Sequence, residues 1–291
     1  MKPARADSPQ AQVLRAACIQ LNSRDDVAAN VRAATDLIER AVAAGARLIV
    51  LPETWNYKGS LSGIHSAGET IDGPSTTRMK ELAALHGVFI LAGSFYERSD
   101  RRGRLFNTSV LFGPSGERLA EYRKLHLFDA VSDTVVYRES DVLRAGDEIV
   151  VAEVDGVPLG LSICYDLRFP ELYVQLALRG ARILAVPAAF TAFTGAAHWH
   201  VLLRARAVET GCFVLAADQA GFHTATNECF GHSLIVDPWG RVLAEVEEGA
   251  GFCIADLDLA QVGDARRVLP CLEHRRPDVY GRVAPEGGSG I

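Results

Sequence analysis

This 291-residue sequence lacks long apolar runs, a signal peptide and clusters of basic residues, and each absence argues against a class of partner or location. No apolar run approaches the length needed to cross a bilayer, and residues 1–10 lack the apolar middle of a signal peptide. Basic residues are scattered and the net charge is −6 at pH 7, which argues against nucleic acid as a partner. We therefore expect neither a membrane nor a nucleic acid as partner, and residues 1–10 and 283–291 are expected to be flexible termini.

The six cysteines are widely spaced and form no Cys-x-x-Cys pair. Three of them (Cys18, Cys212 and Cys253) lie in strand-like apolar runs, so the pattern indicates reduced thiols in a cytoplasmic protein rather than a disulfide framework. His198 and His200 are the only close histidine pair, and an i,i+2 spacing on a helix points the two rings apart. We expect no catalytic metal and no cofactor.

One cysteine stands out by its position between a strand and a helix. Residues 157–163 form an apolar strand that ends at Cys164, and Pro170 suits the first turn of a helix, where its missing N–H would have no partner. Gly180 is expected to end that helix at positive φ. Nearby backbone N–H groups and the helix dipole would favour the thiolate form of Cys164. Cys164 is therefore either a nucleophile or, like most buried cysteines, a small core residue.

Strand-like and helix-like segments alternate along both halves of the chain, and no linker divides it. Asp25 or Asp26 caps a helix that ends at residue 44. We predict one α/β domain over residues 11–282, built as a four-layer α-β-β-α sandwich. The other expected elements are strands at 13–21, 48–53, 88–96, 105–112, 118–124, 182–187, 212–217, 232–236, 242–246 and 252–257, helices at 75–86, 198–209 and 259–268, and loops at 59–73 and 125–146.

Four ionisable residues lie beside apolar or aromatic neighbours: Glu53, Lys124, Glu139 and Cys164. Taken singly, Glu53 could be a turn residue at a strand end, Lys124 a solvated strand edge, and Glu139 an ordinary surface residue. Together they supply what amide hydrolysis by a thiol requires. One carboxylate can move the thiol proton, the ammonium can stabilise the oxyanion, and the second carboxylate can hold the ammonium in place. A cysteine–histidine dyad is an alternative, in which His126, His198 or His232 would be the base.

Three segments resemble the signature segments of the nitrilase or carbon–nitrogen hydrolase superfamily, and they occur in that family's order. They are Leu-Pro-Glu-Thr at 51–54, Tyr-Arg-Lys-Leu-His-Leu-Phe-Asp at 122–129 and Ile-Cys-Tyr-Asp-Leu-Arg-Phe-Pro-Glu-Leu at 163–172. The likeness extends from about residue 13 to residue 280, which is nearly the whole chain.

This resemblance implies a role for each of the four residues. Glu53 would be the general base, Lys124 the oxyanion stabiliser, Glu139 the accessory glutamate and Cys164 the nucleophile. The resemblance also implies the nitrilase-like α-β-β-α sandwich and a homodimer or higher homo-oligomer.

Further segments are similar to the branch of the superfamily that contains deaminated-glutathione amidase and omega-amidase. Three positions depart from that branch: His200 stands where glutamate is usual, the loop at 222–230 lacks basic residues, and Ala145 replaces a proline. The similar segments lie at 193–199, 202–210, 231–233, 237–240 and 274–280.

The branch implies an amidase that hydrolyses the terminal amide of a small carboxylate-bearing substrate through a cysteine thioester and releases ammonia. Deaminated glutathione or a related 2-oxo acid amide is the expected substrate. The alternatives are omega-amidase activity on 2-oxoglutaramate, hydrolysis of a nitrile or an N-carbamoyl amine, and a non-catalytic scaffold, which predicts the loss of a catalytic residue. Arg168 is the expected anchor for the substrate carboxylate unless it forms a structural salt bridge, and Tyr165, Phe190 and Thr194 are expected to line the pocket.

Overall fold

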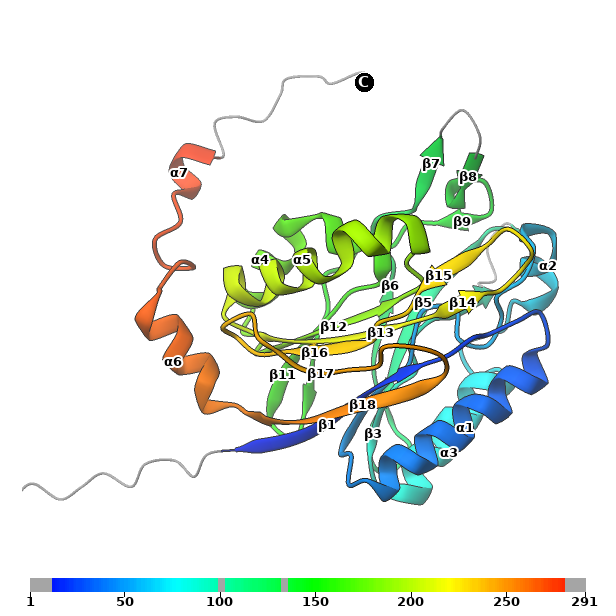
Figure 1. Cartoon of the computed structure of the whole chain (residues 1–291), viewed down its shortest axis with the longest axis horizontal. Coiled ribbons are helices and arrows are strands. Elements are labelled where there is room, and N and C mark those ends of the chain that lie inside the picture. Colours follow the sequence, from blue (N-terminus) through cyan, green and yellow to red (C-terminus); the bar gives the residue numbers. More distant parts are fainter. Residues whose placement is uncertain (1–11, 99–102, 132–135, 281–291) are drawn as a thin grey trace, which may run out of the picture.

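Two β-sheets lie face to face and helices cover their outer sides, so the chain forms the predicted four-layer sandwich (Figure 1). The computed structural model describes residues 12–98, 103–131 and 136–280. The segments 1–10 and 283–291, predicted to be flexible, lie outside these ranges. The covering helices are α1 (Val27–Ala43) and α3 (Pro74–His86) on one side and α4 (Pro170–Leu178) and α5 (Ala192–Thr210) on the other.

The first sheet consists of β1 (Val13–Gln20), β2 (Leu48–Val50), β3 (Phe89–Leu91), β4 (Phe95–Arg98), β5 (Leu105–Phe112), β6 (Arg118–Arg123), β9 (Leu143–Arg144) and β18 (Gly251–Asp258). The strand order is β18-β1-β2-β3-β5-β4, with β6 and β9 both paired to β5. The central strands β1, β2 and β3 run parallel, whereas β18, β4 and β6 pair antiparallel to their neighbours.

The second sheet has the order β10-β11-β12-β13-β16-β17. Its strands are β10 (Val151–Val154), β11 (Val157–Leu161), β12 (Ile183–Ala188), β13 (Phe213–Asp218), β16 (Leu234–Val236) and β17 (Val242–Glu245). Here too three parallel strands, β11 to β13, form the centre. The remaining elements are β7 (Asp129–Val131), β8 (Val136–Arg138), β14 (Ala220–Phe222), β15 (Glu228–Phe230), α2 (Leu61–Ala67), α6 (Ala260–Val268), α7 (Pro277–Tyr280), and the 3-10 turns η1 (Glu139–Asp141) and η2 (Cys164–Arg168).

Strand β1 shows why these sequences form buried sheets. Ala16 and Cys18 face the core between the two sheets, whereas Ala17 and Ile19 face the core beneath α1 and α3. Successive side chains of a strand point to opposite faces, so the part of a strand that is covered on both sides is largely apolar. Among the described residues, no helix is both long enough and apolar enough to cross a membrane.

Most predicted elements are confirmed, including the cap of α1, where the Asp26 carboxylate accepts the Ala29 N–H at 2.9 Å. The predicted start of α5 is wrong, because Thr191 caps that helix and it begins at Ala192 rather than at residue 198. The predicted loop 59–73 contains α2. The predicted strand 88–96 is broken at Gly93, whose φ is +39° and where a Cβ would collide with the backbone of Pro52.

The functional side chains come from the carboxyl ends of strands in both sheets. Strand β2 ends at Val50, three residues earlier than predicted, and the chain then turns to carry Glu53 toward the second sheet. There the Glu53 N–H donates to the carbonyl of Ala188, the last residue of β12. Strand β11 belongs to that second sheet and leads to Cys164. The two sheets therefore each contribute one wall of a single site.

Candidate active site

Three charged side chains meet in the interior. The Lys124 ammonium lies 2.8 Å from a Glu53 carboxylate oxygen and 3.0 and 3.1 Å from the two oxygens of Glu139, and the lysine side chain is completely buried. Lys124 directly follows β6 and is held by its N–H, which donates to the Asn107 carbonyl. Glu139 begins η1, and its carboxylate also accepts the Phe128 N–H at 2.8 Å. A buried charge without a partner would be costly, and here each one is paired.

The Cys164 thiol lies beside this group, near enough to the Glu53 carboxylate and the Lys124 ammonium for both charges to act on its pKa. Cys164 is the first residue of η2 and has a φ of +48°, which is uncommon for a residue with a side chain. Asp166 fixes this turn, because its buried carboxylate accepts the Ile163 N–H at 2.8 Å and the Tyr122 hydroxyl at 2.6 Å. The strained backbone therefore aims the sulfur at Glu53.

The surroundings of the two residues favour a neutral thiol at Cys164 and a carboxylate base at Glu53, rather than a preformed thiolate. Burial raises the pKa of Cys164 well above its usual value, and the neighbouring Glu53 charge raises it further, although Lys124 opposes both. The predicted preference for thiolate is therefore wrong. Burial would also raise the pKa of Glu53, but the charges of Lys124 and Lys58 and the hydrogen bond from Lys124 together outweigh burial and lower that pKa. Glu53 is thus a carboxylate ready to accept the thiol proton.

Lys124 stays charged and Glu139 binds its proton more tightly than a free glutamate does. Burial would lower the pKa of Lys124, but the charges of Glu139 and Glu53 raise it well above its usual value. Burial raises the pKa of Glu139, with Lys124 opposing. The site therefore holds a fixed ammonium beside the sulfur.

The residues predicted to bind substrate make fewer contacts with one another than the charged residues around Lys124 do. The Arg168 guanidinium lies over the ring of Phe190 at 5.0 Å and over that of Tyr165 at 6.0 Å, and it hydrogen-bonds His198 Nδ1 at 3.2 Å. Within the described ranges no carboxylate pairs with Arg168, so the alternative of a structural salt bridge is not supported. Thr194 hydrogen-bonds to the Thr191 cap at the start of α5.

Two residues that the sequence did not reveal hold Glu53 in position. Asn107 donates its side-chain amide to a Glu53 carboxylate oxygen at 2.7 Å, and Gln219 donates to the Glu53 carbonyl at 3.1 Å. Asn107 could have been found, because the predicted hairpin of 105–112 and 118–124 places it opposite Lys124. Nothing in the sequence around Gln219 connects it with Glu53.

A further buried carboxyl, Asp218, lies at the end of β13. Burial raises its pKa well above the usual value, and the nearby Glu53 charge contributes in the same direction. One of its oxygens accepts the Phe190 N–H at 2.9 Å, while the other is buried without a hydrogen-bond partner. The shift favours a neutral acid that can donate a hydrogen bond.

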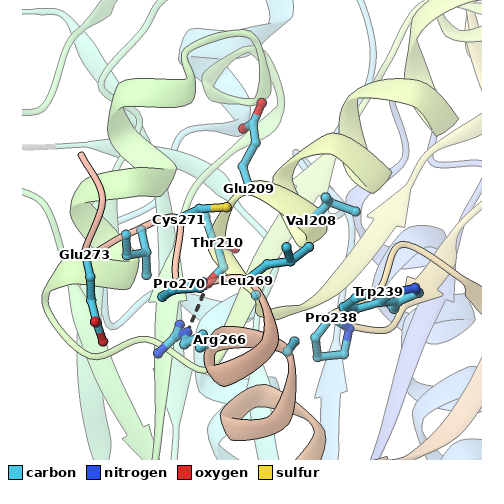
Figure 2. A pocket seen from close by; sticks show the side chains of 13 residues that line it. Val208, Glu209, Thr210, Pro238, Trp239, Arg266, Leu269, Pro270, Cys271 and Glu273 are labelled. Carbon is cyan, nitrogen blue, oxygen red and sulfur yellow. Dashed lines mark hydrogen bonds between the residues drawn. The ribbon is translucent and has the colours of Figure 1, made fainter. Parts of the chain in front are cut away.

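A hollow of about 370 Å³ lies elsewhere, between the end of α5, the 238–240 turn and α6 (Figure 2). It contains none of the predicted site residues, and its Arg266 already donates to the carbonyls of Thr210 and Ala181. Within the described residues, donor atoms that could share a metal ion gather at His200, His232 and Glu245, and none of the four predicted catalytic residues is among them. We therefore place the candidate active site at Cys164.

The fold and the comparisons with known proteins place this protein among the hydrolases of the nitrilase superfamily, which act on C–N bonds. The sequence profile of the family described as carbon-nitrogen hydrolase matches residues 15–267. The chain belongs to the carbon–nitrogen hydrolase family.

Two relatives illustrate the similarity in sequence. The chain is 41% identical over 264 residues to a deaminated glutathione amidase from Synechocystis, covering 89% of this chain and 97% of that protein. It is 42% identical over 269 residues to the nitrilase and fragile histidine triad fusion protein NitFhit of Drosophila melanogaster, covering 91% of this chain. The chain spans 58% of the length of that fusion protein.

Two solved structures illustrate the similarity in fold. The NitFhit protein of C. elegans matches with a TM-score of 0.88 at 38% identity, covering 92% of this chain and 66% of that one. A variant of an amidase from Nesterenkonia sp. AN1 matches with a TM-score of 0.79 at 26% identity, covering 95% and 98%. In that amidase the active-site cysteine carries the covalently added acetamide moiety of fluoroacetamide.

These protonation states predict a broad pH profile. Because the pKa of Glu53 is lowered and that of Cys164 is raised, carboxylate and thiol coexist from acid to alkaline pH. We expect kcat/KM for amide hydrolysis to be flat between about pH 5.5 and 9, with circular dichroism showing an intact fold throughout. A fall in kcat/KM on the acid side, centred near about pH 6.5, would contradict this expectation if it persists in a Glu139→Gln variant. It would indicate an imidazole base, namely His126, His198 or His232.

Proposed function

We propose that this chain is an amidase that hydrolyses the terminal amide of a small carboxylate-bearing substrate through a cysteine thioester. Deaminated glutathione or a related 2-oxo acid amide is the proposed substrate class. The observation that carries the proposal is the buried Cys164 thiol beside Glu53, whose carboxylate accepts a hydrogen bond from the buried Lys124 ammonium at 2.8 Å. Relatives named deaminated glutathione amidase, about 40% identical to this chain, support the substrate class.

Acylation uses Glu53 first as base and then as acid. The Cys164 sulfur attacks the amide carbon while its proton moves to the Glu53 carboxylate. The developing oxyanion is stabilised by the Lys124 ammonium and by the backbone N–H of Tyr165, the residue after the nucleophile. The C–N bond then breaks as Glu53 returns the proton to nitrogen, and ammonia leaves with the acyl group bound to sulfur.

Hydrolysis of the thioester repeats the same proton path with water. Glu53 takes a proton from water as the oxygen attacks the thioester carbon, and Lys124 again stabilises the oxyanion. The C–S bond breaks, the sulfur regains a proton from Glu53, and the carboxylic acid product leaves. Because Glu139 and Asn107 hold Lys124 and Glu53 in position, neither charged group has to reorganise between the two steps.

Arg168 is proposed to bind the carboxylate of the substrate. The residue is half-buried, packs on Phe190 and Tyr165, and follows the nucleophile by four residues. No carboxylate of the described residues occupies its guanidinium, so its charge is available for an anion.

A panel of substrates tests this function. We expect ammonia release to be fastest from a deaminated glutathione analogue, slower from 2-oxoglutaramate, and much slower from a simple nitrile or an N-carbamoyl amino acid. Replacing Arg168 by Gln should lower kcat/KM for the carboxylate substrates by about 10- to 100-fold, the value of a charge-assisted hydrogen bond. Hydrolysis of acetamide, which has no carboxylate, should change little.

The matched control is Arg32→Gln on the exposed face of α1, which should leave all rates unchanged. If Arg168→Gln slows acetamide as much as the acids, Arg168 supports the fold rather than the substrate. If the nitrile or the N-carbamoyl compound is hydrolysed fastest, the proposed substrate class is wrong.

We further propose that the chain acts in the cytoplasm as a homodimer or higher homo-oligomer. The six free cysteines suit a reducing compartment. Large apolar side chains on the outer surface of α5 suit a subunit contact, among them Phe193, Val201 and Val208, which are 90%, 60% and 51% exposed. Light scattering on the purified chain measures its assembly directly.

A further inference from the structure

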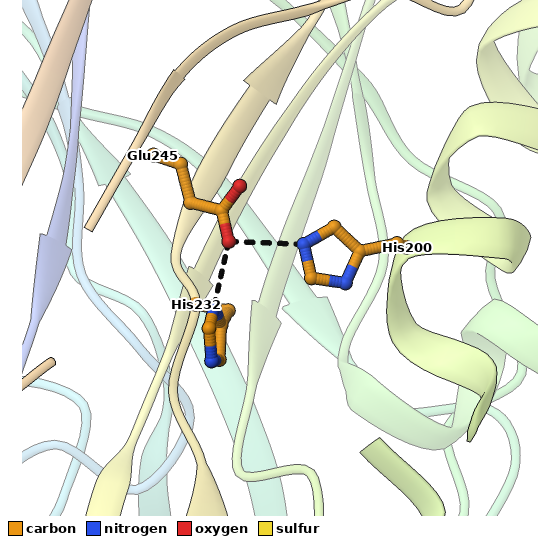
Figure 3. Close-up of side chains that lie close together, drawn as sticks. All are labelled: His200, His232 and Glu245. Atoms are coloured by element: carbon orange, nitrogen blue, oxygen red, sulfur yellow. Dashed lines mark hydrogen bonds and ion pairs between the residues drawn. The ribbon is translucent and has the colours of Figure 1, made fainter. Parts of the chain in front are cut away.

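Three side chains with metal-binding atoms meet outside the candidate active site (Figure 3). His200 comes from α5, His232 precedes β16, and Glu245 ends β17. One Glu245 oxygen lies 2.9 Å from His200 Nε2 and 2.6 Å from His232 Nδ1. All three donor atoms lie within 4.8 Å of one another, so one ion can contact all of them.

The surrounding structure fixes the three donors before any ion arrives. The Val246 N–H donates to the Ser233 carbonyl at 2.9 Å, which keeps Glu245 next to His232. The indole N–H of the buried Trp199 donates to the His232 carbonyl at 2.8 Å, which ties the residue before His200 to the same place. A site whose ligands are already positioned loses little conformational entropy on binding.

The ring orientations are fixed as well. Phe230 stacks on the His232 ring with centroids 4.3 Å apart and meets the His200 ring edge-on at 6.1 Å. The two imidazoles lie 5.5 Å apart at 67°, so they approach Glu245 from different directions. This is the arrangement in which two nitrogens and one oxygen can occupy three corners of a tetrahedron.

We propose that His200, His232 and Glu245 bind one divalent ion of the Zn²⁺ class. Zn–N and Zn–O bonds of about 2.0–2.2 Å in a tetrahedron require donor atoms about 3.3–3.6 Å apart. The present separations from Glu245 are 2.9 and 2.6 Å, and all three donor atoms lie within 4.8 Å of one another. Side-chain shifts of about 1 Å therefore exchange the two hydrogen bonds for metal bonds. Two imidazoles with one carboxylate select Zn²⁺ over Mg²⁺ and Ca²⁺, which prefer oxygen ligands.

Charge and exposure agree with this assignment. Among the described residues the ion pairs of Glu245 are with the two histidines alone, so no lysine or arginine competes for its carboxylate. The side chains of His200, His232 and Glu245 are 38%, 30% and 25% exposed. Solvent can therefore reach the ion and supply a water as fourth ligand.

The ion would join α5 to the hairpin of β16 and β17. Neither Glu53, Lys124 nor Cys164 belongs to the cluster, so the expected effect is on stability rather than on the hydrolytic step. Glu245 lies 45 residues after His200 and 13 residues after His232, so the sequence alone shows no metal-ligand spacing. The third donor, His200, stands at a position where the branch of deaminated-glutathione amidase and omega-amidase usually has glutamate.

The experiment is a calorimetric titration of the chelator-treated full chain with Zn²⁺, with Mg²⁺ as comparison. The test variants are His200→Asn, Glu245→Gln and His232→Asn, the last chosen because Asn tolerates the φ of +54° at that position. The control is His274→Asn, an exposed histidine outside the cluster. We expect one Zn²⁺ per chain, binding at least about tenfold weaker in each test variant and unchanged in the control. Zn²⁺ should raise the melting temperature of the chain and the control only.

Co²⁺ spectra of the unaltered chain test the same site without relying on variants. Visible bands of four-coordinate Co²⁺ without a thiolate charge-transfer band support the cluster. A thiolate band would place the ion on a cysteine such as Cys271, which is exposed, and would overturn the proposal. Undiminished Zn²⁺ binding in all three test variants, or equal responses to Zn²⁺ and Mg²⁺, would overturn it too.

Discussion

Replacing Cys164 by Ala is expected to abolish ammonia release while the chain still folds. The sulfur is the only atom of the residue that takes part in the proposed chemistry, and removal of a nucleophile typically costs about 10⁴-fold or more in kcat. The thiol is small, so its loss leaves a cavity of one atom in a core that remains otherwise packed. Rates of ammonia release together with thermal unfolding measure both effects.

The matched control is Cys212→Ala, another buried free cysteine, which lies just before β13. It should retain nearly full activity, because none of its hydrogen bonds reaches Glu53 or Lys124. Mass spectrometry should also detect an acyl adduct on Cys164 in the unaltered chain during slow turnover, and none in the Ala variant. Turnover that survives the loss of Cys164 would end the thioester proposal.

The fold could be predicted from the sequence wherever local pattern and tertiary burial agree. Strand β5 (Leu105–Phe112) was predicted to the residue, because a segment of mostly apolar and β-branched side chains ends at a glycine turn. The start of α5 was missed because Phe193 to Ala197 has no apolar period, and the helix there depends on the Thr191 cap. Strand 88–96 was predicted as one piece because the close backbone contact at Gly93 comes from a distant segment.

The same distinction holds for the candidate site. Glu53, Lys124, Glu139 and Cys164 were singled out as ionisable residues in apolar segments, where such residues need partners, but their roles were implied only by the resemblance to the nitrilase superfamily. The preference of Cys164 for thiolate was predicted wrongly, because it rested on the local turn. The Glu53 charge that contributes to its raised pKa comes from the other sheet, and its burial comes from the packing of the whole fold. Long-range packing of this kind is not readable from one segment.

Replacing Lys124 by Met is expected to lower both activity and stability. The proposed oxyanion loses its main cation, and removing one such donor costs about 10²- to 10³-fold in kcat. Two buried carboxylates, Glu53 and Glu139, also lose the ammonium that lies 2.8 and 3.0 Å from them. Breaking a buried ion pair by removing one partner costs about 3–5 kcal/mol of unfolding free energy. Urea unfolding at pH 7 measures the second effect.

The stability of this variant should also depend on pH in a defined direction. Without Lys124 the folded pKa values of the two buried carboxyls rise above their unfolded values, so the folded state binds more protons. Its unfolding free energy should therefore increase as the pH is lowered from 7 to 5, and decrease as the pH is raised. The unaltered chain should show a smaller gain, because only the pKa of Glu139 is raised there and that of Glu53 is lowered. Lys80→Met on the exposed face of α3 is the control and should change neither quantity.

A double variant separates the catalytic role of Lys124 from its structural one. Adding Glu139→Gln to Lys124→Met removes one of the two unpaired carboxylates, so part of the lost unfolding free energy should return at pH 7. Activity should not return, because the oxyanion still lacks its cation. If activity recovers together with stability, Lys124 only supports the fold. The backbone N–H of Tyr165 would then have to stabilise the oxyanion without it.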